Sequence, residues 1–150
     1  MTSDREEERL GALARYAILD TSPEQAFDDV AKLAAALCDT PIALVSLVDR
    51  DRQWFKAVVG LDLTETPRAI SFCSHAIEGE GPFIVEDASG DERFANNPLV
   101  TGALSLRFFA GVPLVEEHDG LALGTLCARA RSRPLPSPRR ERRLPLRRLR

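Results

Sequence analysis

The sequence is poor in the residues that many catalytic and structural sites require. Its 150 residues include only two histidines, three cysteines, one methionine and one tryptophan. It has no run of about 18 apolar residues, so we expect no membrane-spanning helix, and its acidic first residues lack the apolar stretch of a signal peptide. The cysteines Cys38, Cys73 and Cys127 are odd in number and far apart, which argues against a disulfide framework and a structural zinc site. We therefore expect a protein of the reducing cytoplasm.

Charge is distributed unevenly along the chain. The net charge is −3, but residues 1–128 carry 22 acidic and 10 basic side chains, a balance of −12, whereas residues 129–150 carry ten arginines and one acid. A body this acidic should repel nucleic acid, and the basic segment has no aromatic side chain for stacking on bases. We expect neither a nucleic-acid nor a membrane partner. Residues 128–150 are interpreted as a disordered Arg/Pro-rich tail, with an anion-binding arm and a product of a shifted reading frame as alternatives.

Hydrophobic periodicity predicts one folded domain between residues 23 and 127, after a polar lead segment of residues 1–22. A helix is expected from Pro23 to Leu37, with Ser22 as its N-cap and an apolar face that includes Phe27. Short apolar, β-branched runs predict strands at 42–48, 53–59, 83–85, 106–115 and 121–127. Both faces of the first strand are apolar, so we expect it to be central and covered on both sides.

This order of elements indicates the α+β class. Strand hairpins lie near both ends of the predicted domain, and few long helices occur, which disfavours a doubly wound α/β fold. The loop-rich middle of the chain, residues 60–105, is where we expect a pocket, on the sheet face opposite the Pro23–Leu37 helix.

A series of short motifs follows one another between residues 12 and 127. They are LDTSPE at 19–24, PIALVSLVD at 41–49, QWFK at 53–56, ISFCSHAI at 70–77, DERFANNPLV at 91–100, RFFAGVPL at 107–114 and GTLC at 124–127. In order and spacing this series resembles the GAF domains of bacterial sensor proteins. The resemblance implies a PAS-like fold, in which a central antiparallel sheet of five or six strands carries helices on one face and a loop-covered pocket on the other.

The resemblance also implies a function in bacterial signal transduction, for example in two-component systems. Such a domain binds a small molecule or a partner protein and modulates an output protein such as a histidine kinase or a diguanylate cyclase. We expect a regulatory domain and not an enzyme, with no catalytic residue and no metal ligand, and the sequence identifies no cofactor. Prolines replace the helix that usually ends such a domain, so we expect only a weak homodimer and an exposed stripe around Phe27, Ala31 and Ala34.

Nine residues are candidates for ligand binding, because arginine beside aromatic side chains suits an anionic or planar ligand. They are Trp54, Arg68, Phe72, Cys73, His75, Asp87, Phe94, Arg107 and Phe109. The alternative is that the charged members are surface residues and the aromatic ones belong to the core.

The alternative function is a thiol-dependent reductase of the free methionine sulfoxide type. Some relatives carry this activity with cysteines in the pocket loops, and Cys73 lies at a comparable position. The segment from Phe94 to Gly102 contains no cysteine, and Cys38 and Cys127 are expected in the core. Cys73 and His75 are two residues apart and would not share a helix face. We therefore predict that Cys73 is not catalytic.

Overall fold

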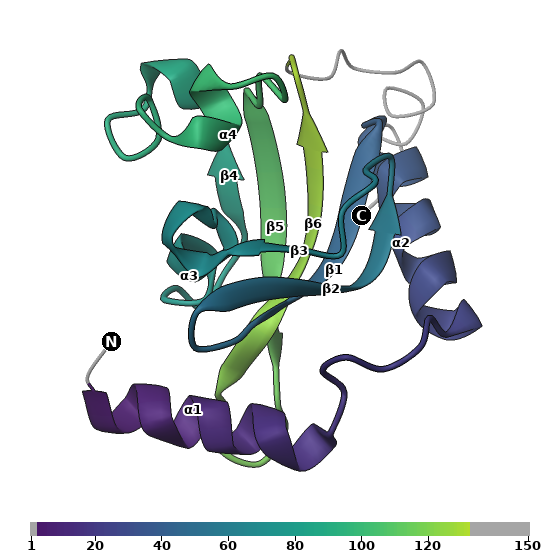
Figure 1. Ribbon diagram of the computed structural model, residues 1–150, viewed down its shortest axis with the longest axis vertical. Coiled ribbons are helices and arrows are strands. Elements are labelled where there is room, and N and C mark those ends of the chain that lie inside the picture. The colour runs from purple at the N-terminus through teal and green to yellow at the C-terminus, as the bar shows by residue number, and fades with distance from the viewer. Residues whose placement is uncertain (1–2, 133–150) are drawn as a thin grey trace, which may run out of the picture.

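The computed structural model describes residues 3–132 (Figure 1). Two helices precede the first hairpin: α1 (Ser3–Tyr16), α2 (Gln25–Cys38), β1 (Ile42–Val48) and β2 (Arg52–Val59). The middle of the chain holds only short elements: β3 (Glu65–Pro67), α3 (Cys73–Ala76), β4 (Phe83–Val85), α4 (Pro98–Thr101) and two 3-10 turns at 68–70 and 88–90. A second hairpin, β5 (Phe108–Val115) and β6 (Ala122–Ala130), follows.

All six strands form one antiparallel sheet in the order β3-β2-β1-β6-β5-β4. This confirms the α+β prediction. It also confirms the predicted position of the first strand, since β1 lies between β2 and β6 and every one of its residues is buried. Its alternate side chains reach two separate cores, Leu44 one and Val45 the other.

The helices and the loops cover opposite faces of this sheet (Figure 1). On one face, Ala31 of α2 packs against Val45 and Ala57. Leu13 of α1 packs against Leu47 in a neighbouring cluster, across one end of the sheet. The opposite face lies under α3, α4 and their loops, which contribute most of the largest apolar cluster.

Helix α1 was not expected, because residues 1–22 are too polar to suggest a core element. The helix nevertheless buries Arg9, Ala12 and Leu13 at spacings of three and four residues. This single buried stripe is enough to pack α1 against the sheet, and the guanidinium of Arg9 belongs to the stripe. The polar composition belongs to its solvent-facing side.

The start of α2 also differs from the prediction, and Ser22 is not its cap. The N-cap is Glu24, which makes no side-chain capping hydrogen bond. Instead the buried amine of Lys56 lies 2.6 Å from the Glu24 carboxylate and donates to the Ser22 carbonyl at 2.7 Å. A tertiary contact from β2 therefore fixes this helix entry in place of a local cap.

The exposed apolar stripe of α2 is real, but its residues differ from those expected. Ala31 is fully buried against the sheet, whereas Val30, Leu33 and Leu37 are 44%, 59% and 52% exposed. The stripe is rotated because the alanines, with their small side chains, face the sheet and allow close approach.

The last strand extends three residues beyond the expected end at Cys127. Ala128, Arg129 and Ala130 pair with β5, so the first residues of the expected tail belong to the sheet. The alternation of side chains in a strand places Arg129 on the same inward face as Cys127. The disorder expected for the tail concerns mainly residues 133–150, which lie outside the described residues. Within residues 3–132, no helix is both long and apolar enough to cross a bilayer.

Candidate functional site

The loop-covered face holds three of the nine predicted site residues in a tight aromatic cluster. The rings of Phe72 and Phe94 stack with centroids 4.0 Å apart, and the Phe109 ring lies 5.4 Å from that of Phe72. All three side chains are at most 1% exposed. His75 lies beside them at the surface, with its ring edge-on to Phe94 at 4.8 Å. The cluster explains why segments distant in sequence meet above the sheet.

Four other predicted residues lie away from this cluster. Trp54 is on the opposite face, under α1. Arg68 pairs with Glu6 of α1, with Nη1 2.5 Å from the carboxylate. Asp87 accepts a hydrogen bond from the Ser89 amide, and Arg107 donates to the Val100 carbonyl at 2.9 Å. These three charged side chains therefore stabilise local structure and do not converge on the aromatic cluster.

Cys73, the remaining candidate, belongs to a buried polar group that we call the Arg129 cluster. Its members are at most 3% exposed and come from two strands, β2 and β6, and from the start of α3: Gln53, Ser71, Cys73, Thr125 and Arg129. Arg129 donates through Nη2 to the Gln53 Oε1 and to the Cys73 Sγ, both at 3.5 Å. Ser71 donates to the same Gln53 oxygen at 2.5 Å, and the Cys73 Sγ lies 2.9 Å from the Thr125 hydroxyl.

Arg129 is the exceptional member of this cluster. Its side chain is about as buried as any in the core, yet no carboxylate among residues 3–132 pairs with it. Its Nε has no hydrogen-bond acceptor there either. The Phe109 ring, 5.3 Å from the guanidinium carbon, supplies a weak cation–π contact. A buried cation without a counter-ion is costly, so this position favours an anion.

Cys73 and Cys127 are the groups beside Arg129 that can supply negative charge. Burial raises the pKa of its thiol, but hydrogen bonding with Cys127, the positive charge of Arg129 and the Thr125 hydroxyl outweigh burial, so the pKa falls below the usual range. Burial and the neighbouring Cys73 raise the pKa of Cys127. Only one of the two thiols therefore ionises readily. The cluster therefore accommodates one negative charge, on the Cys73 thiolate.

Sequence reasoning missed Arg129 and Cys127 as partners of Cys73. Arg129 precedes a run of arginines and was assigned to the tail, although Thr125, Cys127 and Arg129 alternate as inward-facing strand residues do. That alternation was the available signal. No group of three or more His, Cys, Asp or Glu side chains in the described part of the chain is arranged to hold a metal ion.

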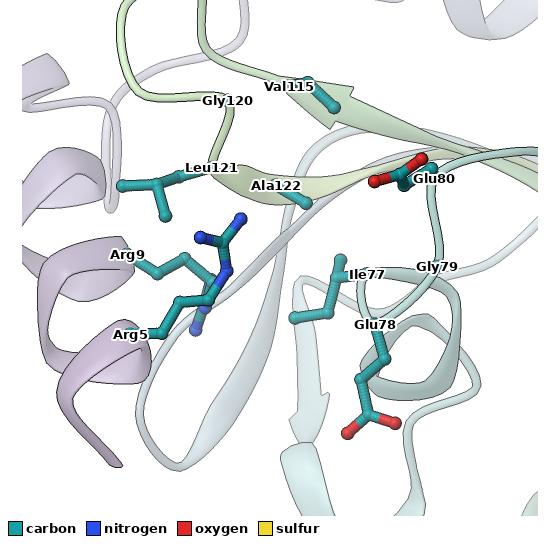
Figure 2. A pocket seen from close by; sticks show the side chains of 10 residues that line it. All are labelled: Arg5, Arg9, Ile77, Glu78, Gly79, Glu80, Val115, Gly120, Leu121 and Ala122. Atoms are coloured by element: carbon teal, nitrogen blue, oxygen red, sulfur yellow. The ribbon is translucent and has the colours of Figure 1, made fainter. Parts of the chain in front are cut away.

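A separate cavity of about 560 Å³ lies between α1, the loop after α3 and the turn that joins β5 to β6 (Figure 2). None of the nine predicted residues lines it. Its walls comprise Arg5, Arg9, Ile77, Glu78, Gly79, Glu80, Val115, Gly120, Leu121 and Ala122.

Comparison with known proteins supports one family. The GAF domain profile matches residues 22–144. A cyclic di-GMP phosphodiesterase of Pseudomonas aeruginosa is 43% identical over 122 residues, which are 81% of this chain and 21% of that protein. The chain thus spans about a fifth of the length of this relative.

Solved structures agree on the fold. The GAF domain of a phosphoenolpyruvate-protein phosphotransferase from Coxiella burnetii superposes with a TM-score of 0.59 at 16% identity, over 95% of this chain and 87% of that one. The free methionine-R-sulfoxide reductase of Neisseria meningitidis gives 0.56 at 20% identity, over 88% of this chain and 78% of that one. The profile match, the relative and the six-stranded sheet lead to one conclusion: this chain belongs to the GAF domain family.

Proposed function

We propose that this domain is a regulatory module of cyclic di-GMP signalling that senses a small anion at the Arg129 cluster. The relative from Pseudomonas aeruginosa supports the signalling context, because it is a cyclic di-GMP phosphodiesterase. The matched segment makes up only about a fifth of its length. The proposed output is therefore a cyclic di-GMP phosphodiesterase, in place of the kinase or cyclase expected from the sequence. The domain itself acts by binding and not by catalysis, and its three free cysteines suit the cytoplasm.

The buried Arg129 side chain, whose Nε has no partner within the described residues, supports the proposed ligand. A compact anion with two or more acceptor atoms would satisfy this donor and neutralise the charge. Gln53, Ser71 and Thr125 offer further hydrogen-bonding groups around the same point. The Phe109 ring lies against the guanidinium, and burial of the cluster strengthens electrostatic interactions within it.

A path for the signal runs from the cluster to α1. Ser71 and Cys73 lie at the start of α3, and the Ser74 hydroxyl donates to the Arg68 carbonyl at 3.3 Å. The Arg68 side chain in turn pairs with Glu6 on α1. An anion that replaces the Cys73 thiolate would shift the start of α3 and, through Arg68, the position of α1. We propose that α1 transmits occupancy to the output domain.

Calorimetric titration with acetate, nitrate and phosphate tests this proposal. The wild type is expected to bind at least one of them, and Arg129→Met should lose about ten- to a hundredfold in affinity, as expected when a hydrogen bond to a charged group is removed. Arg131→Met is the matched control, because Arg131 is exposed just beyond the strand, and should bind as the wild type does. Absence of binding to all three anions, or equal binding by Arg129→Met, would contradict the proposal.

A thiol-dependent reductase remains the second candidate, and the adjacency of Cys73 and Cys127 favours it. In that reaction the Cys73 thiolate would attack the sulfoxide sulfur, leaving a thioether and a sulfenic acid on Cys73. Cys127 would then condense with the sulfenic acid, releasing water and forming a disulfide that an external dithiol reduces. Burial of the two thiols disfavours this reaction, because Cys73 and Cys127 are only 0% and 2% exposed. Incubation with methionine sulfoxide and dithiothreitol distinguishes the two: the regulatory proposal predicts no methionine formation.

A further inference from the structure

The cavity beside α1 shares no lining residue with the Arg129 cluster and has a distinct polarity. Its volume of about 560 Å³ is in the range of pockets that hold small molecules. Its apolar wall includes Ile77, Leu121 and Ala122, which are continuous with the two main apolar clusters of the domain. A ligand in this cavity would therefore contact well-packed apolar side chains, with charged groups around them.

Arg9 marks the α1 side of this cavity. Its side chain is fully buried, and its Nε and Nη2 pair with the Glu6 carboxylate at 2.9 and 3.0 Å. Its Nη1 is buried without any hydrogen-bond partner among the described residues. The remaining donor needs an acceptor, since an unsatisfied buried group at this site costs free energy. Arg9 thus places a buried guanidinium behind the α1 wall of the cavity.

Acidic side chains mark the opposite side. In Figure 2 the Arg5 and Arg9 side chains extend from α1, and the Glu80 carboxylate lies across the cavity under the strands. The Glu78 carboxylate points away from the arginines in the same view. Glu80 forms no ion pair within residues 3–132. The cavity is thus positive on one wall, negative on the other and apolar between them.

We propose that this cavity binds a zwitterionic ligand of the amino-acid type. Its carboxylate would lie against the α1 wall formed by Arg5 and Arg9, its ammonium group would lie near Glu80, and its side chain would rest on Ile77, Leu121 and Ala122. A simple anion fits less well, because Glu6 already balances Arg9 and the Glu80 carboxylate lies across the cavity from the arginines. The separation of the two charges across an apolar floor is the feature that selects a zwitterion.

The fluorescence of Trp54 can report occupancy of this cavity. Trp54 is the only tryptophan in the chain, and it packs in one cluster with Leu13 of α1 and with Leu121, which also lines the cavity. Occupancy should change the surroundings of the indole and hence its fluorescence.

The test is a fluorescence titration of the whole chain with each of the standard L-amino acids, followed by calorimetry. At least one amino acid should shift Trp54 emission and bind more tightly than its deaminated carboxylate and its decarboxylated amine. For leucine these analogues are 4-methylpentanoate and isopentylamine. The proposal is overturned if no amino acid binds, or if the zwitterion and both single-charge analogues bind equally.

Glu80→Gln and Glu78→Gln form the matched pair of variants. Both residues are exposed, so neither change should affect folding. Glu80→Gln should weaken amino-acid binding by up to about fivefold, the range of an exposed ion pair, and leave binding of the carboxylate analogue unchanged. Glu78→Gln should bind as the wild type does. An equal loss in both variants would indicate a general effect of negative charge and would contradict the proposed geometry.

Discussion

Arg9 and Arg129 are both fully buried arginines, but their surroundings differ. Arg9 has a carboxylate partner in Glu6, held in a two-point contact, whereas Arg129 is surrounded within residues 3–132 by the neutral Gln53 oxygen, the Cys73 and Cys127 sulfurs and the Phe109 ring. A paired charge contributes to docking of an element, and an unpaired one costs stability unless something else neutralises it. Arg9 therefore contributes to the docking of α1, whereas burial of Arg129 does not stabilise the fold unless an anion accompanies it.

The sharpest test of this difference is removal of the paired arginine. Arg9→Met breaks the contact with Glu6 and leaves that partly buried carboxylate to Arg68 alone, so we expect a loss of about 2–3 kcal/mol in the free energy of unfolding. Urea unfolding followed by Trp54 fluorescence measures it. A loss below about 0.5 kcal/mol, the range of ordinary surface changes, would mean that α1 does not depend on this pair.

The opposite sign is expected for Arg129. Below the Cys73 pKa of about 6, where the thiol is neutral, Arg129→Met replaces an uncompensated buried cation by an apolar side chain of similar length, and we expect the free energy of unfolding to rise by about 1–2 kcal/mol in anion-free buffer. The same urea experiment measures it. Destabilisation comparable to that of Arg9→Met would show that Arg129 is a structural residue and would remove the contrast.

The ionisation of Cys73 sharpens the same contrast. Because Arg129 and Cys127 hold the pKa of the Cys73 thiol below its usual range, the thiolate should form below the ordinary cysteine pKa of about 8.5. Its stabilising contribution is therefore present above that value and is lost as pH falls through the lower folded-state pKa. The ionisation is followed by the ultraviolet absorbance of the thiolate, measured against pH in wild type, Cys73→Ser and Arg129→Met. The low-pH transition should vanish in Cys73→Ser and move to higher pH in Arg129→Met; an unchanged transition in Arg129→Met would contradict the assignment.

The smallest expected effect concerns Glu6. Hydrogen bonding to Arg9 lowers its pKa from 4.5 to about 2, with Arg68 as a second partner. A depressed carboxyl pKa stabilises the fold above the unfolded value and ceases to do so as pH falls from about 4.5 towards 2. Solvent screens this partly exposed group, so Glu6→Gln should cost only about 1 kcal/mol at neutral pH. The difference between wild type and Glu6→Gln should disappear near pH 2, and a constant difference across that range would argue against the pairing.

The strands were predictable from the sequence, and the site only in part. Apolar β-branched runs such as residues 42–48 identify a central strand whatever the surrounding fold. Phe72, Phe94 and Phe109 were grouped correctly as neighbours. Trp54 was not, because it lies next to Phe55 and adjacent strand residues face opposite sides of a sheet.

The two buried arginines were the main features that sequence reasoning could not find. Arginine is rarely buried, so a run of charged residues is normally assigned to solvent. Arg9 lies in an acidic helix and Arg129 lies at the edge of an arginine-rich segment. In each of these charged segments one arginine faces inward and is buried. Only the alternation of strand residues and the helical stripe of α1 distinguish them from their neighbours.

The most direct measurement is the NMR signal of the Arg129 side-chain Nε–H, assigned by its absence in Arg129→Met. This donor has no partner within the described residues, so titration with acetate, nitrate or phosphate should shift the resonance to lower field and slow its exchange with water as a hydrogen bond forms. Glu6 already occupies the Arg9 Nε–H, which should stay unchanged as an internal control. A shift confined to Arg129 is the predicted result; an Arg129 signal unaffected by all three anions would contradict the claim that this buried cation is the sensing site.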